Sequence, residues 1–145
     1  MTLDPFTPLP DGPAGSVLCI EDDPICRQLV EGVLAAKPRV RLLQAASGRE
    51  GVAAAQRDMP DVVLLDMHLP DIGGLEVVRA LSEPISQNRL HVILLTADSF
   101  SIDVVKAMSL GAKDYWPKPI DAARLLAGVD RALAEVAARR ARSGA

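Results

Sequence analysis

The sequence has few aromatic residues and no long apolar run. Aromatic side chains make up 3% of the 145 residues, too few for a platform that stacks single-stranded nucleic acid, and the net charge of −3 gives no overall attraction to phosphate backbones. Direct binding of nucleic acid is therefore not expected. No apolar run approaches the ~20 residues that cross a bilayer, and the first residues lack the basic and apolar regions of a secretory signal. We therefore expect a cytoplasmic protein without membrane contact.

Cysteine is also scarce. Its two copies, Cys19 and Cys26, fall in a predicted buried strand and in the helix predicted after it. A disulfide or a shared metal is the alternative, but the sequence contains no second cluster of cysteine and histidine that would complete a metal site. We interpret both residues as reduced core thiols and not as candidate functional residues.

The rest of the composition fits one folded domain with short extensions. Hydrophobic residues are 49% and charged residues 24% of the chain, as in ordinary globular proteins. Residues 1–15 contain four prolines, which obstruct helix and sheet hydrogen bonding, so we predict a flexible N-terminal segment. We place the folded domain at 16–139 and a basic tail at 140–145, interpreted as a solvated helix end, with a weak anionic contact as the alternative.

From residue 17 onward, strand and helix patterns alternate. Short aliphatic runs predict strands at 17–21, 40–45, 62–66, 90–96 and 113–116. Amphipathic spacing predicts helices at about 24–34, 47–57, 75–81 and 99–111 and from 121 onward, with a polar loop at 83–89. Parallel neighbours need right-handed crossovers, so five such pairs predict an α/β fold: a doubly wound parallel sheet with helices on both faces.

Helix-start signals support these boundaries. Pro24 follows Asp23, which we interpret as a helix N-cap in preference to a metal ligand. Ser47 and Glu50 form a capping-box pattern, and Asp121 is suited to cap the last helix.

Polar side chains follow the ends of four predicted strands. Glu21 and Asp22 close the first strand, Asp66 the third and Thr96 the fourth, and Lys118 lies just beyond the fifth. In doubly wound sheets, ligands bind outside the carboxyl ends of the strands, so we expect these residues in one pocket. Crowded carboxylates favour a hard divalent cation, Mg²⁺ or Mn²⁺, which binds phosphate oxygens in turn. An ammonium and a hydroxyl suit the remaining oxygens, so the set predicts a phosphorylation site.

With these residues in place, the chain resembles the receiver domain of two-component response regulators. The resemblance covers residues 17 to about 134 and rests, in order, on VLCIEDDP, LLDMHLP, LLTAD and DYWPKP. It implies a flavodoxin-like receiver fold with five helices and a five-stranded sheet in the order 2-1-3-4-5. It also implies a phosphorylation-controlled signalling switch that turns over no external substrate.

The resemblance implies a role for each acidic residue at this edge. Asp66 would accept a phosphoryl group from the phosphohistidine of a histidine kinase or phosphotransfer protein. Glu21 and Asp22 would hold Mg²⁺ together with Asp66, and the backbone carbonyl of His68 would complete the protein ligands.

The resemblance further implies how the site reaches the surface. Lys118 and Thr96 would bind phosphoryl oxygens, Tyr115 would turn inward as Thr96 moves toward the phosphate, and the Lys118–Pro119 bond would be cis. The implied output surface, about residues 99–139, would bind a downstream protein, domains of a parent chain or a second copy of the chain as a homodimer. The chain either acts alone or is the C-terminal receiver of a hybrid histidine kinase, for which the proline-rich start is suggestive.

Two other interpretations were compared with this one. An aspartate after an apolar strand also begins phosphotransferases and phosphatases with an aspartyl intermediate, but His68 stands where these enzymes usually have a second acid. A receiver-like scaffold that is never phosphorylated would lack a key group, and none is missing. The chain departs from the family in Gly73-Gly74, where an aspartate often precedes the glycine, and in Glu-Asp instead of Asp-Asp.

Overall fold

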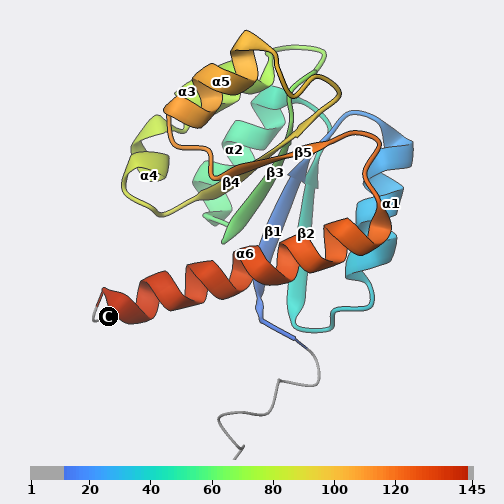
Figure 1. The fold of residues 1–145 in the computed structure, drawn as a ribbon, viewed down its shortest axis with the longest axis vertical. Coiled ribbons are helices and arrows are strands. Elements are labelled where there is room, and N and C mark those ends of the chain that lie inside the picture. Colours follow the sequence, from blue (N-terminus) through green and yellow to red (C-terminus); the bar gives the residue numbers. More distant parts are fainter. Residues whose placement is uncertain (1–11, 144–145) are drawn as a thin grey trace, which may run out of the picture.

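One parallel sheet organises the computed structural model, which describes residues 12–143 (Figure 1). Its strand order is β2-β1-β3-β4-β5, which confirms the predicted order. The strands are β1 Gly15–Ile20, β2 Val40–Ala45, β3 Val62–Asp66, β4 His91–Thr96 and β5 Asp114–Pro117. Most of the predicted flexible segment, residues 1–11, lies outside the described residues, and Gly15 of that segment already belongs to β1.

Six helices are present among residues 12–143, one more than predicted. They are α1 Pro24–Leu34, α2 Gly48–Asp58, α3 Gly74–Ala80, α4 Ser82–Ser86, α5 Ile102–Ser109 and α6 Ala122–Arg142. The additional helix, α4, lies where we predicted a polar loop, so that prediction was wrong. Pro84 falls in its first turn, where a helix needs no backbone N–H donor, and buried Ile85 anchors the turn to the core.

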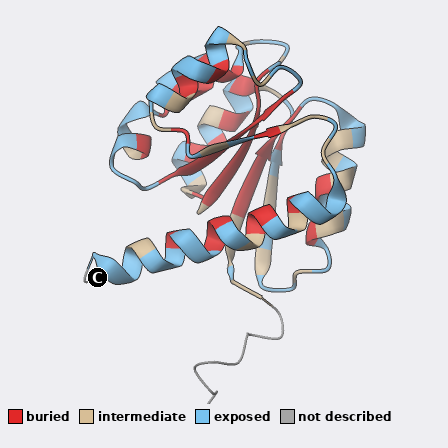
Figure 2. Cartoon of the chain, in the orientation of Figure 1, coloured by how far each residue is buried: buried red, intermediate tan, exposed pale blue. Residues whose placement is uncertain are grey.

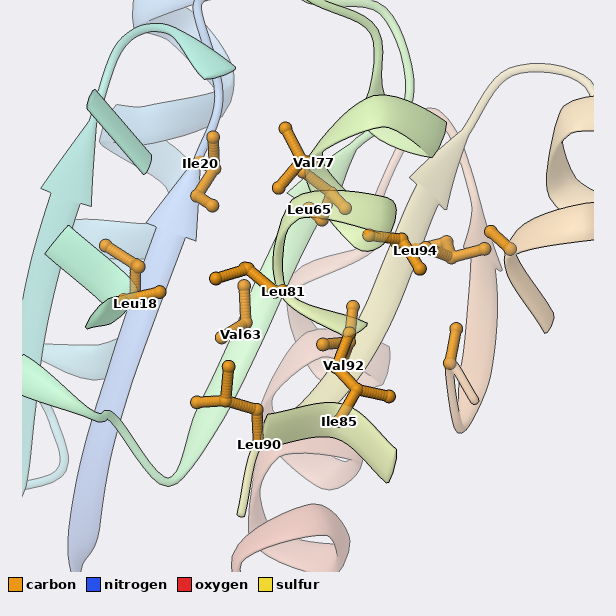
Figure 3. Packing of buried hydrophobic residues seen from close by; sticks show 14 of the residues in the cluster. Leu18, Ile20, Val63, Leu65, Val77, Leu81, Ile85, Leu90, Val92 and Leu94 are labelled. Atoms are coloured by element: carbon orange, nitrogen blue, oxygen red, sulfur yellow. The ribbon is translucent and has the colours of Figure 1, made fainter. Parts of the chain in front are cut away.

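Each face of the sheet carries its own core, because successive residues of a strand point to opposite sides. Leu18, Val63 and Leu94 point to the face covered by α2, α3, α4 and α5, where Val77, Leu81 and Ile85 meet them, as Figure 3 shows. The other face packs against α1 and α6 through a second set of residues: Val17, Cys19, Leu64, Ile93, Val30, Leu125 and Val129. Buried residues therefore fill the three central strands almost completely (Figure 2).

The last helix is the longest, and its final turns extend beyond the rest of the fold (Figure 1). Asp121 caps its start by accepting a hydrogen bond from the N–H of Ala123, at 2.9 Å. Residues 140–142, which we expected in the basic tail, continue this helix to Arg142. Within residues 12–143, no helix combines the length and the apolar character that crossing a membrane requires.

Candidate functional site

The predicted site residues meet at the carboxyl edge of the sheet. Glu21 follows β1 directly, Asp66 and Thr96 are the last residues of β3 and β4, and Lys118 follows β5. The register explains why they meet: β1, β3 and β4 are neighbours, and Asp66 lies beside Leu95, the residue before Thr96. The four residues before this edge are apolar in β1, β3 and β4, so Glu21, Asp66 and Thr96 are the first polar residues after each of these runs.

Lys118 links two of the carboxylates. Its Nζ donates to Oε1 and Oε2 of Glu21, at 2.9 and 3.1 Å, and lies 3.2 Å from Oδ1 of Asp66. Glu21 is fully buried, and Asp66 is 3% exposed. The N–H of His68 donates to Oδ1 of Asp66 at 3.0 Å, which fixes the orientation of that carboxylate. The imidazole-bearing residue His68 is itself exposed.

Burial and the contacts among Glu21, Asp66 and Lys118 determine the pKa shifts at the site. Burial and the hydrogen bond with Asp66 raise the pKa of Glu21 to about 7, although Lys118 acts in the opposite direction. For Lys118, burial lowers the pKa, but the hydrogen bond and charge of Glu21 and the charge of Asp66 outweigh it, so its pKa lies above the ordinary value. The lysine is therefore held as an ammonium between two acidic groups.

The acidic residues are suited to hold a divalent cation. Glu21, Asp22 and Asp66 each offer a carboxylate oxygen, and these oxygens lie within 4.8 Å of one another. Asp22 is exposed, which leaves one side of the cluster open to water. One ammonium cannot balance all three carboxylates, and a hard cation that keeps several waters prefers such oxygen ligands. The donor set thus fits Mg²⁺ or Mn²⁺.

The two residues assigned to the switch are placed differently from each other. Thr96 is 1% exposed, and its hydroxyl donates to the carbonyl of Asp98 and accepts from the N–H of Asp98, both at 3.0 Å. Tyr115 is 40% exposed, so much of its side chain faces solvent. The Lys118–Pro119 bond is cis, as the resemblance implied.

An apolar groove opens beside Lys118. Its volume is about 520 Å³, and residues from α1 and from the turn after β5 line it: Ile25, Cys26, Leu29, Lys118, Pro119 and Ile120. Ile25 is 76% exposed at its rim. Both cysteines are free thiols, Cys19 buried and Cys26 half-buried, and burial raises the pKa of Cys26 to about 11, so its thiol stays protonated.

Sequence reasoning missed two residues that hold the loops of the site. Nη1 of Arg27 donates to the backbone carbonyls of Glu21 and Asp22, at 2.9 and 3.1 Å. The carboxylate of Asp71, in the loop after β3, accepts from the N–H groups of Gly48 and Arg49 at the start of α2, at 2.8 and 2.9 Å. These hydrogen bonds, with that from Arg49 contributing most, lower the pKa of Asp71 to about 2.

Comparison with known proteins gives a consistent result. The family model described as "Response regulator receiver domain" matches residues 17–130. The protein PilH of Pseudomonas aeruginosa is 32% identical over 118 residues, which are 81% of this chain and 97% of PilH. The transcriptional regulatory protein AfsQ1 of Streptomyces coelicolor is 40% identical over 105 residues, 72% of this chain but only 45% of AfsQ1.

Solved structures agree with these matches. The signal receiver domain of a putative Luxo repressor protein from Vibrio parahaemolyticus superimposes with a TM-score of 0.79 at 25% identity, covering 91% of this chain and 99% of that one. The chemotaxis response regulator CheY4 of Vibrio cholerae gives a TM-score of 0.73 at 27% identity, covering 82% and 98%. The likeness thus extends over nearly the whole of two receiver structures but less than half of AfsQ1.

Proposed function

The chain belongs to the response regulator receiver domain family, whose general function is phosphorylation-controlled signalling, and we propose that it carries out this function through Asp66. The donor is the phosphohistidine of a histidine kinase or phosphotransfer protein. The observation that carries the proposal is a buried aspartate whose oxygen lies 3.2 Å from a lysine ammonium, with two more acidic residues beside it. We place the receiver domain at residues 16–139 and propose that it acts in the cytoplasm.

The reaction transfers a phosphoryl group from the imidazole of the donor to the carboxylate of Asp66. A carboxylate oxygen of Asp66 bonds to phosphorus while the phosphorus–nitrogen bond of the donor breaks, and the electron pair of that bond stays on the imidazole. The product is an acyl phosphate on Asp66. Glu21, Asp22, Asp66 and the carbonyl of His68 would hold Mg²⁺ or Mn²⁺, which supplies positive charge to the phosphoryl oxygens. No external substrate is turned over.

Lys118 and Thr96 would hold the oxygens that remain. The Lys118 ammonium exchanges part of its contact with Glu21 for a phosphoryl oxygen, because the new group adds about −1.5 to −2 charge units. The Thr96 hydroxyl exchanges its bonds to Asp98 for another phosphoryl oxygen, and the loop that leads to α5 moves with it. Tyr115 then has space to turn inward. Phosphorylation thereby changes the surface of α5, β5 and α6.

That surface supports binding of a protein partner. Phe100, Ile102, Val105 and Tyr115 are large apolar residues with exposed fractions of 93%, 70%, 59% and 40%. Such side chains contribute strongly to interfaces when a partner removes them from water. We infer that a downstream protein, domains of a longer parent chain or a second copy binds here, and that the phosphoryl donor uses the groove beside Lys118.

Chemical phosphorylation tests the proposal. The full chain is incubated with Mg²⁺ and acetyl phosphate, and intact mass is followed. We expect one phosphoryl adduct that hydroxylamine removes, that EDTA prevents and that Asp66→Asn abolishes. Asp61→Asn, at the opposite edge of the sheet, is the matched control and keeps the adduct. An adduct that persists in Asp66→Asn would refute the assignment of the acceptor.

The groove has a separate test with a donor protein. Ile25→Glu places a charge on the exposed rim without touching the acidic cluster. We expect it to slow phosphotransfer from a phosphorylated histidine phosphotransfer protein while leaving phosphorylation by acetyl phosphate unchanged, since the small donor needs no docking surface. Equal slowing with both donors would contradict the assignment of this groove.

A further inference from the structure

The backbone that carries Glu21 and Asp22 lies between the sheet and the first helix. The N–H of Glu21 donates to Ala45 at 3.0 Å and continues the sheet pattern. The first carbonyl that α1 uses is that of Asp23, which accepts from the N–H of Arg27 at 3.0 Å. The carbonyls of Glu21 and Asp22 come between these two systems, and within residues 12–143 they accept no hydrogen bond from a backbone N–H of the sheet or of α1.

The side chain of Arg27 bonds to both carbonyls. One nitrogen, Nη1, donates to Glu21 at 2.9 Å and to Asp22 at 3.1 Å, and a guanidinium nitrogen of this kind carries two N–H groups for the purpose. The Glu21 carbonyl shares a peptide plane with the N–H of Asp22, and the Asp22 carbonyl shares one with the N–H of Asp23, so the two planes flank the Cα of Asp22. Fixing these planes fixes the direction in which the carboxylate side chains leave the backbone.

We propose that Arg27 is a positioning residue for the cation site, which it serves by holding the backbone of Glu21 and Asp22 so that their carboxylates converge on Asp66. This inference rests on the proposed function. Outer contacts that orient metal ligands commonly matter nearly as much as the ligands themselves, because a cation bound through few carboxylates tolerates little misplacement.

A purely electrostatic role of Arg27 predicts the opposite change in cation affinity. A guanidinium near the acidic cluster repels a cation, so removing its charge would tighten cation binding if Arg27 acted only through its charge. If Arg27 acts through its two hydrogen bonds, removing them frees the backbone and weakens binding. The sign of the change in affinity therefore separates the two roles.

Direct cation binding is the readout. Mn²⁺ is titrated into the unphosphorylated full chain, and free Mn²⁺ is measured by electron paramagnetic resonance. We expect Arg27→Gln to raise the dissociation constant about 10-fold, in the range found for contacts that orient metal ligands. Arg27→Lys, which keeps a charged donor nitrogen, should recover part of the loss. Arg41→Gln removes the same charge from an exposed position of β2 and should leave the affinity unchanged.

Phosphorylation by acetyl phosphate gives a second readout. The Mg²⁺ concentration for half-maximal rate should rise in Arg27→Gln by the same factor as the dissociation constant, whereas the rate at saturating Mg²⁺ should stay close to that of the wild type. A general loss of structure would lower the saturated rate as well.

Each outcome decides the matter. Arg27→Met keeps the aliphatic packing of the side chain and serves as a second variant if Arg27→Gln does not fold. An unchanged or tighter Mn²⁺ affinity in either folded variant overturns the inference, and so does the failure of both to fold, because Arg27 would then support the whole domain. If the wild type itself binds no Mn²⁺ and forms no adduct, the proposed function fails. If the wild type binds Mn²⁺ and forms the adduct but the Arg27 variants are unaffected, only the positioning role of Arg27 is rejected.

Discussion

Charged and polar side chains lie at both ends of the parallel strands, the amino edge and the carboxyl edge of the sheet. Their charges are balanced differently at the two ends. At the amino edge, Asp61 accepts from the N–H and hydroxyl of Ser16, at 2.7 and 3.2 Å, and pairs with Arg140 of α6. Buried His91 accepts at Nδ1 from Nη2 of Arg139, at 2.8 Å. Each of these groups has a partner. At the carboxyl edge, the single ammonium of Lys118 faces three carboxylates.

This difference separates a structural edge from a functional one. Paired groups at the amino edge hold the last turns of α6 against the starts of β1, β3 and β4, and the carboxylate of Asp61 already has a cation partner in Arg140. The excess negative charge at the carboxyl edge is unfavourable in the protein alone and is relieved when a cation binds. Proteins commonly break local rules of stability at the sites where they act.

The largest expected effect tests whether the carboxyl edge alone carries the chemistry. Lys118→Met removes the ammonium that would bind a phosphoryl oxygen, and we expect phosphorylation by acetyl phosphate to slow about 10- to 100-fold, the equivalent of one hydrogen bond to a charged group. Arg139→Met removes a cation from the amino edge and should leave the rate unchanged. Intact mass over time measures both, and similar slowing in the two variants would break the comparison.

The next effect concerns the free energy of unfolding, which we expect to depend on the paired groups of the amino edge. Asp61→Ala leaves the N–H of Ser16 and the guanidinium of Arg140 without their partner, so we expect the free energy of unfolding to fall by about 2 kcal/mol. Asp66→Asn keeps an acceptor for His68 and lessens repulsion among the carboxylates. Measured in EDTA, its unfolding free energy should equal or exceed that of the wild type. Urea titration followed by the fluorescence of buried Trp116 compares them, and a larger loss in Asp66→Asn would contradict the assignment of the two edges.

A third effect is the response of stability to Mg²⁺. A cation that binds only the folded chain should stabilise it by about 1.4 kcal/mol at ten times its dissociation constant. Asp22→Asn should lose most of this gain, because Asp22 is a predicted ligand, and EDTA should abolish it. Asp61→Asn should keep the full gain although its baseline stability is lower. Thermal melting with and without Mg²⁺ measures the response, and an equal gain in Asp22→Asn would count against the proposed ligand set.

Much of this arrangement was readable from the sequence, and the exceptions share a cause. Aliphatic runs that end in Asp66 and Thr96 predicted both the strands and their common edge, because a buried parallel strand leaves a strong local pattern. The helix α4 was missed because Pro84 and its polar neighbours are typical of loops, and only the burial of Ile85 in the folded core favours a helix.

The side-chain contacts of the loops were harder to predict. Asp71 caps α2 although 22 residues separate it from Arg49 in the sequence. Arg27 is close in sequence to the carbonyls it binds, but nothing in a single basic residue on a helix distinguishes it from a solvated one. The amino edge was not predicted as a unit because Asp61, His91 and Arg140 lie far apart in the chain, and each residue type alone is ordinary on a surface.

The last expected effect is a pH dependence that differs in sign between the edges. Because arginine only donates, Nδ1 of His91 must be unprotonated to accept from Arg139. Burial, and then the charge of Arg139, lower the pKa of His91 in the folded chain below its ordinary 6.5. The contribution of His91 to stability is therefore complete above pH 6.5 and is lost as the pH falls through the folded pKa.

Glu21 should act in the opposite sense. Its folded pKa, raised to about 7 from 4.5, gives a contribution that is complete below pH 4.5 and is lost as the pH rises through 7. The unfolding free energies of wild type, His91→Gln and Glu21→Gln are measured between pH 5 and 8 in EDTA. Relative to the wild type, we expect His91→Gln to gain stability toward pH 5 and Glu21→Gln to gain stability toward pH 8. Changes of the same sign would mean that the two edges are not electrostatically distinct.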